Sequence, residues 1–221
     1  MEGTTTSGSP RSGDAAPAAG PLPDAVVASI ESHLKQREAR REEIYQRARR
    51  LRRLAQSTMT RLHEGQGVAG DLEELRRLTR ELSEWIRAEG RGDEGIAHDA
   101  FQEAVEACLL GAVVRGHALP GPADLGVDPE SFLLGLGDLV GEVRRLILAR
   151  LNAGDLADAD RMLTLMDTLY RTLMRFDTTR SIVALKPKQD TARALLERTR
   201  GEVTMAHLLA RARLPSSPGE P

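Results

Sequence analysis

The chain of 221 residues is 40% hydrophobic and has no apolar run long enough to cross a bilayer, so one or two domains without a membrane span are predicted. Its net charge of −2 conceals 28 arginines and only three lysines, so the overall charge neither requires nor excludes an anionic partner. Six aromatic residues are too few for recognition of nucleic acid by rows of stacked rings, and one cysteine leaves no intrachain disulfide. A reducing, cytoplasmic location is expected.

The two ends of the chain differ in composition from its middle. Residues 1–23 are rich in Gly, Ser, Thr, Ala and Pro, and residues 214–221 read LPSSPGEP. Both ends carry too little apolar surface to offset the cost of ordering the chain, so they are predicted to be disordered. Residues 24–213 instead repeat apolar side chains at helical spacing, which predicts an all-α domain.

The first helix is predicted over residues 24–63, which makes it longer than a compact domain needs. The segment GQGVAGD ends it, and Asp71 is the predicted N-cap of a second helix that reaches Ala88. A third helix is predicted over residues 94–115. The following segment, HALPGPADLGVDP, is predicted to be a loop.

The second half of the domain is also predicted to be helical. Pro129 suits the first turn of a fourth helix over residues 129–152. Asp155 is expected to cap a fifth helix through Phe176. One or two further helices follow Pro187, with a break near Gly201.

Acidic side chains precede an uncharged stretch in the third helix, FQEAVEACLLGAVVRG. On a helical wheel Asp99, Glu103 and Glu106 fall within about 60° of one another, so they form one acidic strip. The uncharged stretch indicates that this helix is surrounded by protein, with the acids at the edge of the packed region. Paired carboxylates there repel unless they are protonated or joined by a cation, whereas an exposed acidic face is the more frequent cause of such spacing.

The fourth helix carries a second acidic pair. Asp138, Glu142 and Arg145 lie on one side of it, nearly opposite its apolar face. Three glycines in the helix interior indicate that a helix or a ligand approaches its backbone closely: Gly135, Gly137 and Gly141.

Four carboxylates on two helices can be explained together by coordination of a hard cation. Oxygen ligands suit Mg²⁺ or Mn²⁺, whereas a structural zinc site would need Cys and His. Two unrelated surface pairs remain the alternative on spacing alone.

Arginines are concentrated in the first helix between residues 37 and 53. Arg47, Arg50 and Arg53 share one helical edge that could bind phosphate, and Arg145 beside Glu142 is a further candidate for contact with nucleic acid. Pairing between Glu and Arg within the helix and solvation are the commoner reasons for mixed charge on a long helix.

From FQEAVEA onward the chain resembles the translin family, and more closely its catalytic branch, the translin-associated factor X (Trax) proteins. The matching segments are FQEAVEA, PESFLLGLGDLVGEVRRL, LNAGDLADADRMLTLMDTLYRTL and ALKPKQDTARALLERTRG, in the same order as in the family. The resemblance implies a bundle of about seven helices with a long first helix, assembled into a hollow, usually octameric shell around single-stranded RNA or DNA.

In the catalytic branch, acidic residues in these segments form the nuclease centre, and they fall on Glu103, Glu106, Asp138 and Glu142. The resemblance therefore implies an endoribonuclease that depends on Mg²⁺ or Mn²⁺ and acts on single-stranded RNA inside a homo-oligomer. A translin-like protein that binds single-stranded RNA or DNA without cutting it is the alternative. The segment GIAHDA is less basic than the nucleic-acid-binding segment of translin, so the resemblance does not identify which arginines contact RNA.

Overall fold

The computed structural model describes residues 22–89, 94–177 and 181–212, and these residues contain seven helices and no strand. The all-α prediction is therefore confirmed. The predicted disorder of residues 1–23 and 214–221 lies outside the described residues, except for Leu22 and Pro23. None of the described helices is long and apolar enough to span a membrane.

The chain divides into two units, and the division falls within the first helix, after Arg40. This helix, α1, spans Asp24–His63 as predicted. In the first unit its apolar side chains, such as Ile30 and Leu34, are exposed to solvent. In the second unit α1 instead contributes buried side chains at three- and four-residue spacing to the core, from Ile44 to Leu62.

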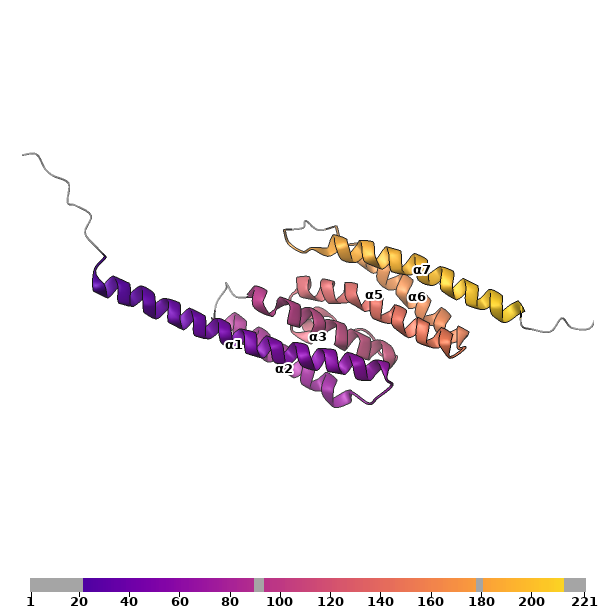
Figure 1. Ribbon diagram of the computed structural model, residues 1–221, viewed down its shortest axis with the longest axis horizontal. Coiled ribbons are helices and arrows are strands. Elements are labelled where there is room, and N and C mark those ends of the chain that lie inside the picture. The colour runs from indigo at the N-terminus through magenta and orange to yellow at the C-terminus, as the bar shows by residue number, and fades with distance from the viewer. Residues whose placement is uncertain (1–21, 90–93, 178–180, 213–221) are drawn as a thin grey trace, which may run out of the picture. The chain divides into compact units, whose positions relative to one another are not determined.

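The core of the second unit is formed around two helices, α3 (Glu94–Val114) and α5 (Pro129–Asn152). Residues 107–113 of α3 are all buried, which confirms that this uncharged stretch is surrounded by protein. α5 packs against α3 on one side, and against α6 (Leu156–Leu173) and α7 (Leu185–Ala212) on the other. Figure 1 shows α3, α5 and α7 running side by side.

α5 and α6 begin where Pro129 and Asp155 predicted, whereas α6 ends at Leu173 and not at Phe176 as expected. Pro129 lies in the first turn of α5, where its missing N–H has no helical partner, and the Asp128 side chain accepts a hydrogen bond from the Ser131 backbone N–H at 2.7 Å. Asp155 caps α6 by accepting a hydrogen bond from the Asp158 backbone N–H at 3.0 Å.

Two predicted boundaries in the first half of the domain were wrong. α2 spans Ala69–Glu89, so Asp71 lies inside its first turn, where it pairs with Arg61 instead of capping the helix. The segment predicted to be a loop contains a short helix, α4, over Pro122–Leu125. Four residues are too few to show a helical period in a sequence.

The prediction for the last helix was also wrong in two respects. α7 begins at Leu185, with Pro187 in its first turn, and continues through Gly201 without a break. A glycine inside a helix costs about 1 kcal/mol relative to alanine. The flanking residues Thr199 and Val203 are both buried, and this packing outweighs that cost.

The three glycines of α5 do not share one cause. A Cβ on Gly135 would lie 2.7 Å from the carbonyl oxygen of Gln102 on α3, and one on Gly137 would lie 2.8 Å from Cβ of Lys188 on α7. Nothing approaches Gly141 more closely than a Leu195 methyl at 4.0 Å. The close approach predicted for the α5 backbone is therefore confirmed at the first two glycines and not at the third.

Candidate acidic metal centre

The four predicted acids lie together between α3 and α5. Burial and the neighbouring charges of Asp138, Glu142 and Glu103 raise the pKa of the Glu106 carboxyl to about 8. The positive charge of Lys188 lowers this pKa, but by less than these effects raise it. Each of the three other acids is therefore close enough to Glu106 for its negative charge to raise the pKa of Glu106. The acids of the two helices are therefore near one another, and their role as metal ligands stays a prediction.

Asp138 is held by two side chains that the sequence did not single out as site residues. Gln102, which precedes Glu103 on α3, donates a hydrogen bond from Nε2 to one oxygen of Asp138. Lys188, in the first turn of α7, forms an ion pair with the other. Because Gly137 has no side chain, the aliphatic part of Lys188 can lie directly against α5 on its way to Asp138.

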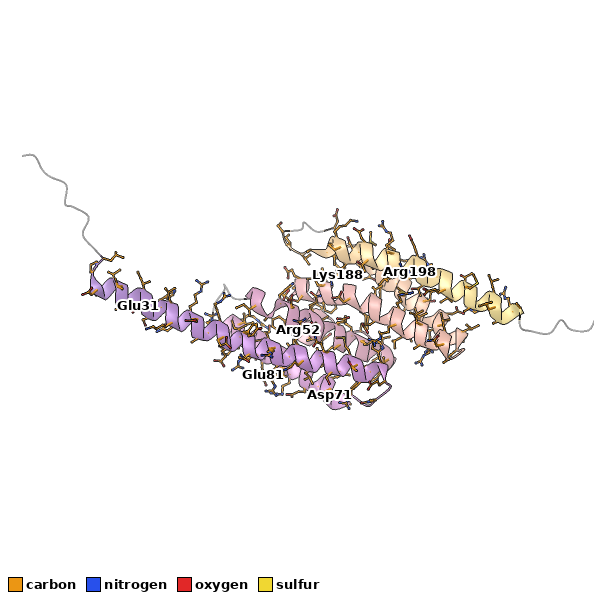
Figure 2. The ribbon with its side chains drawn as sticks, viewed as in Figure 1. Glu31, Arg52, Asp71, Glu81, Lys188 and Arg198 are labelled. Carbon is orange, nitrogen blue, oxygen red and sulfur yellow. The ribbon has the colours of Figure 1, made fainter. Side chains whose placement is uncertain are left out.

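Two of the acids, Glu103 and Glu142, each contact a side chain of α1. Arg52 donates from Nε to Oε1 of Glu103 at 2.6 Å, and the ring of His63 contacts Oε2 of Glu142 through Nε2. Basic side chains from α1 and α7, two helices far apart in the sequence, therefore engage the acids of α3 and α5; Figure 2 labels Arg52 and Lys188 on these helices.

The donor set suits a hard divalent cation. All four candidate ligands are carboxylates, and Oε2 of Glu103 is buried without a hydrogen-bond partner. In the arrangement described, no group of three or more His, Cys, Asp or Glu side chains is placed to hold a metal ion within residues 22–89, 94–177 and 181–212. Oxygens of Asp138, Glu142 and Glu103 instead contact Lys188, Gln102, His63 and Arg52.

Arg47 and Arg50, which were predicted to bind nucleic acid along one helical edge with Arg53, each form an ion pair with a glutamate. Arg47 pairs with Glu43 at 2.6 Å and lies over the ring of Trp85, and Arg50 pairs with Glu74 on α2 at 3.1 Å.

The two remaining predicted arginines, Arg53 and Arg145, lie in different places. Arg53 lines a cavity between α1 and α3. Arg145 is exposed, and its Nη1 lies 3.9 Å from Oε2 of Glu142. That pair is a weak, solvent-screened contact, so the Arg145 guanidinium remains accessible.

Sequence reasoning did not assign Arg52, His63, Gln102 or Lys188 to the acidic site. His63 and Glu142 are 79 positions apart, and no spacing rule links them. Gln102 and Lys188 did lie in the quoted segments FQEAVEA and ALKPKQD, next to positions that were singled out. The sequence therefore indicated the segments that contain these two residues, but not that both contact Asp138.

Comparison with known proteins shows what this helical bundle is similar to. No protein-family model matches the chain. An uncharacterized protein of Methanocaldococcus jannaschii is 30% identical over 178 residues, which cover 78% of this chain and 78% of that protein.

Solved structures extend the likeness to the whole fold. AfC3PO in a complex with duplex RNA is 31% identical to this chain, with a TM-score of 0.76 and coverage of 86% of this chain and 99% of that one. A crystal structure of AfC3PO gives 30% identity and a TM-score of 0.75, with coverage of 83% and 97%. Apo-NeC3PO, at 22% identity and a TM-score of 0.75, shows the same fold. The chain belongs to the translin family, and its fold is that of the C3PO proteins.

Proposed function

We propose that the protein is a metal-dependent endoribonuclease of the Trax-like, catalytic branch of its family, active in the cytoplasm. The observation that carries this proposal is the cluster of four carboxylates from α3 and α5, in which the pKa of Glu106 is raised to about 8 by burial and by the other three acids. Such crowding of like charge is unfavourable in a protein that only packs its helices, and it is typical of a site that takes up a cation.

Glu103, Glu106, Asp138 and Glu142 are the residues that would hold Mg²⁺ or Mn²⁺. When bound, such a cation activates a water molecule and offsets the negative charge that grows on the phosphate as the phosphodiester bond breaks.

The chain's own side chains hold this centre in place. Gln102 fixes one oxygen of Asp138, and Arg52 fixes one oxygen of Glu103 while its other oxygen stays buried and unpartnered. Glu142 completes the set of ligands or orients the attacking water. Arg145, exposed beside Glu142, is placed to contact a phosphate oxygen.

RNA is the proposed substrate because a structural relative of the same family is seen in a complex with duplex RNA. The family resemblance noted in the sequence favours single-stranded RNA, with single-stranded DNA as a further ligand. Cleavage of both single strands and duplexes therefore has to be measured. We further propose that the protein acts as a homo-oligomer, an octamer that encloses the RNA, and light scattering of the purified chain measures the number of subunits.

The central experiment is a nuclease assay on end-labelled single-stranded and duplex RNA, with and without Mg²⁺. We expect internal cleavage that EDTA abolishes and that Mn²⁺ restores. Glu106→Gln keeps the shape of the side chain and removes its charge, so it should reduce cleavage by at least 100-fold. Glu84→Gln makes the same change on an exposed position of α2 and should cleave as the natural protein does.

Two outcomes would count against the proposal. Full activity of Glu106→Gln would exclude this acid as a ligand. Retention of RNA without cleavage under every metal condition would identify the protein as a binding-only member of the family.

A further inference from the structure

A basic cavity of about 510 Å³ lies between α1 and α3, beside the acidic centre. Three arginines of α1 line it, Arg49, Arg52 and Arg53, together with Gln56. Asp99 of α3 is the one acidic residue in its lining. The lining therefore carries a net positive charge, in a chain whose overall charge is −2.

Arg52 connects this cavity with the acidic centre. Its Nε donates to Glu103, yet 52% of its side chain is exposed. A guanidinium has five N–H donors in a rigid plane, so the contact with Glu103 leaves others directed elsewhere. A phosphate group bound to Arg52 from the cavity would therefore lie next to a candidate metal ligand.

The arginines of this part of α1 differ in whether their charge is neutralised. Arg47 and Arg50 pair with Glu43 and Glu74. Arg49 and Arg53, by contrast, form no hydrogen bond or ion pair with any residue in the described part of the chain, and both line the cavity. Exposed positive charge without a carboxylate partner is the feature that binds phosphate and releases counterions.

We propose that Arg49 and Arg53 bind the phosphodiester backbone of RNA in this cavity and that Arg52 holds the phosphate nearest to Glu103. The inference rests on the proposed function for the identity of the ligand. Arg49 and Arg53 are four residues apart, about 6 Å along the helix axis, so one strand that follows α1 can contact both. Asp99 repels that strand and reduces its affinity.

Binding of fluorescently labelled RNA, measured by anisotropy over a range of salt concentrations in EDTA, tests the inference without any cleavage. Single-stranded and duplex RNA of one sequence are compared. Affinity falls as salt rises, and the double variant Arg49→Ala/Arg53→Ala should make this fall less steep. The magnitude of the slope of log affinity against log salt should decrease by about 1.4 for a single strand or about 1.8 for a duplex, since each lost phosphate contact removes about 0.7 or 0.9. Asp99→Asn should raise the affinity for the same RNA.

The matched control removes two arginines from the same helix, Arg47→Ala/Arg50→Ala, and should leave the salt slope unchanged. A second test, Arg49→Lys/Arg53→Lys, keeps both charges and should retain the natural slope. Melting curves of every variant verify that the helix still packs.

The inference would be overturned if both alanine double variants showed the same decrease in the salt dependence of RNA affinity. It would also be overturned if Arg49→Ala/Arg53→Ala kept the salt dependence of the natural protein. If the natural protein cleaves RNA but this variant keeps its salt slope, the cavity assignment fails and the nuclease proposal stands. If the natural protein binds neither RNA, both fail together.

Discussion

Replacement of Gly135 by alanine gives a direct measure of how closely α3 and α5 approach each other. A Cβ at this position would lie 2.7 Å from the Gln102 carbonyl oxygen and 2.7 Å from a Val105 methyl, whereas ordinary contact begins at 3.4 Å. The two helices would have to move apart by about 0.7 Å, the difference between these distances. A backbone oxygen cannot rotate away as the end of a flexible side chain can, so the strain falls on the packing of the two helices.

Gly141→Ala is the matched control, because this residue lies on the same helix and its nearest neighbour is 4.0 Å away. Both substitutions gain the same helix propensity, about 1 kcal/mol, so the difference between the two variants isolates the cost of overpacking. We expect Gly141→Ala to stabilise the protein and Gly135→Ala to destabilise it, with a difference of about 3 kcal/mol, at the upper end of the usual range.

Thermal unfolding followed by circular dichroism at one protein concentration measures this difference. For a domain of this size about 3 kcal/mol corresponds to a separation of roughly 6–12 °C between the two melting temperatures. If Gly135→Ala melts at or above the temperature of Gly141→Ala, the helices are not in the contact described.

Three further predictions concern other buried groups. In EDTA at about pH 9, above the pKa of about 8 of the Glu106 carboxyl, Glu106→Gln should melt at a higher temperature than the natural protein because it removes one of four neighbouring negative charges. The gain should be smaller at about pH 6, where this carboxyl is protonated in the folded protein, and should vanish below its usual pKa of 4.5, where the unfolded chain is protonated as well. Mg²⁺ should raise the melting temperature of the variant less than that of the natural protein. A lower melting temperature of the variant in EDTA at about pH 9 would contradict the repulsion between these acids. Burial raises the pKa of the Cys108 thiol from 9.0 to about 11, so at pH 8 its thiolate fraction is about 100-fold below that of an unfolded chain, and iodoacetamide should label it only after denaturant is added. Gln189 is buried and donates to the carbonyl oxygens of Leu173 and Phe176 at 2.9 Å, so Gln189→Leu should lower the free energy of unfolding by about 1–3 kcal/mol in a urea titration, and an unchanged midpoint would contradict the role of these bonds.

The helical period of the sequence predicted most of the fold because it reports which side of each helix is apolar. The limits of α1 and α5 and the burial of residues 107–113 follow from that period and from residues that favour the first turn of a helix, such as Pro129. The break expected at Gly201 did not occur, since a local propensity of about 1 kcal/mol is smaller than the effect of packing on both sides.

The candidate site was predictable only as far as local spacing reaches. Glu103 and Glu106 are one helical turn apart, so their shared strip could be predicted from the sequence. Lys188 is 50 positions from Asp138, and the period of α7 indicates which face is apolar but not which acid its first turn meets. Contacts of this kind depend on the order in which helices pack, and this information is not contained in any single helix.

The position of Lys188 has a consequence for how the protein matures in the cell. Domains fold as they emerge from the ribosome, N-terminal parts first, and α7 is synthesised after the other six described helices. Until it docks, Asp138 and the acids around it have no ammonium group from that side, so a nascent or prematurely ended chain carries an excess of negative charge at its centre. Docking of α7 is therefore expected to stabilise the acidic centre, and fragments ending before residue 185 should be degraded faster than fragments that include α7.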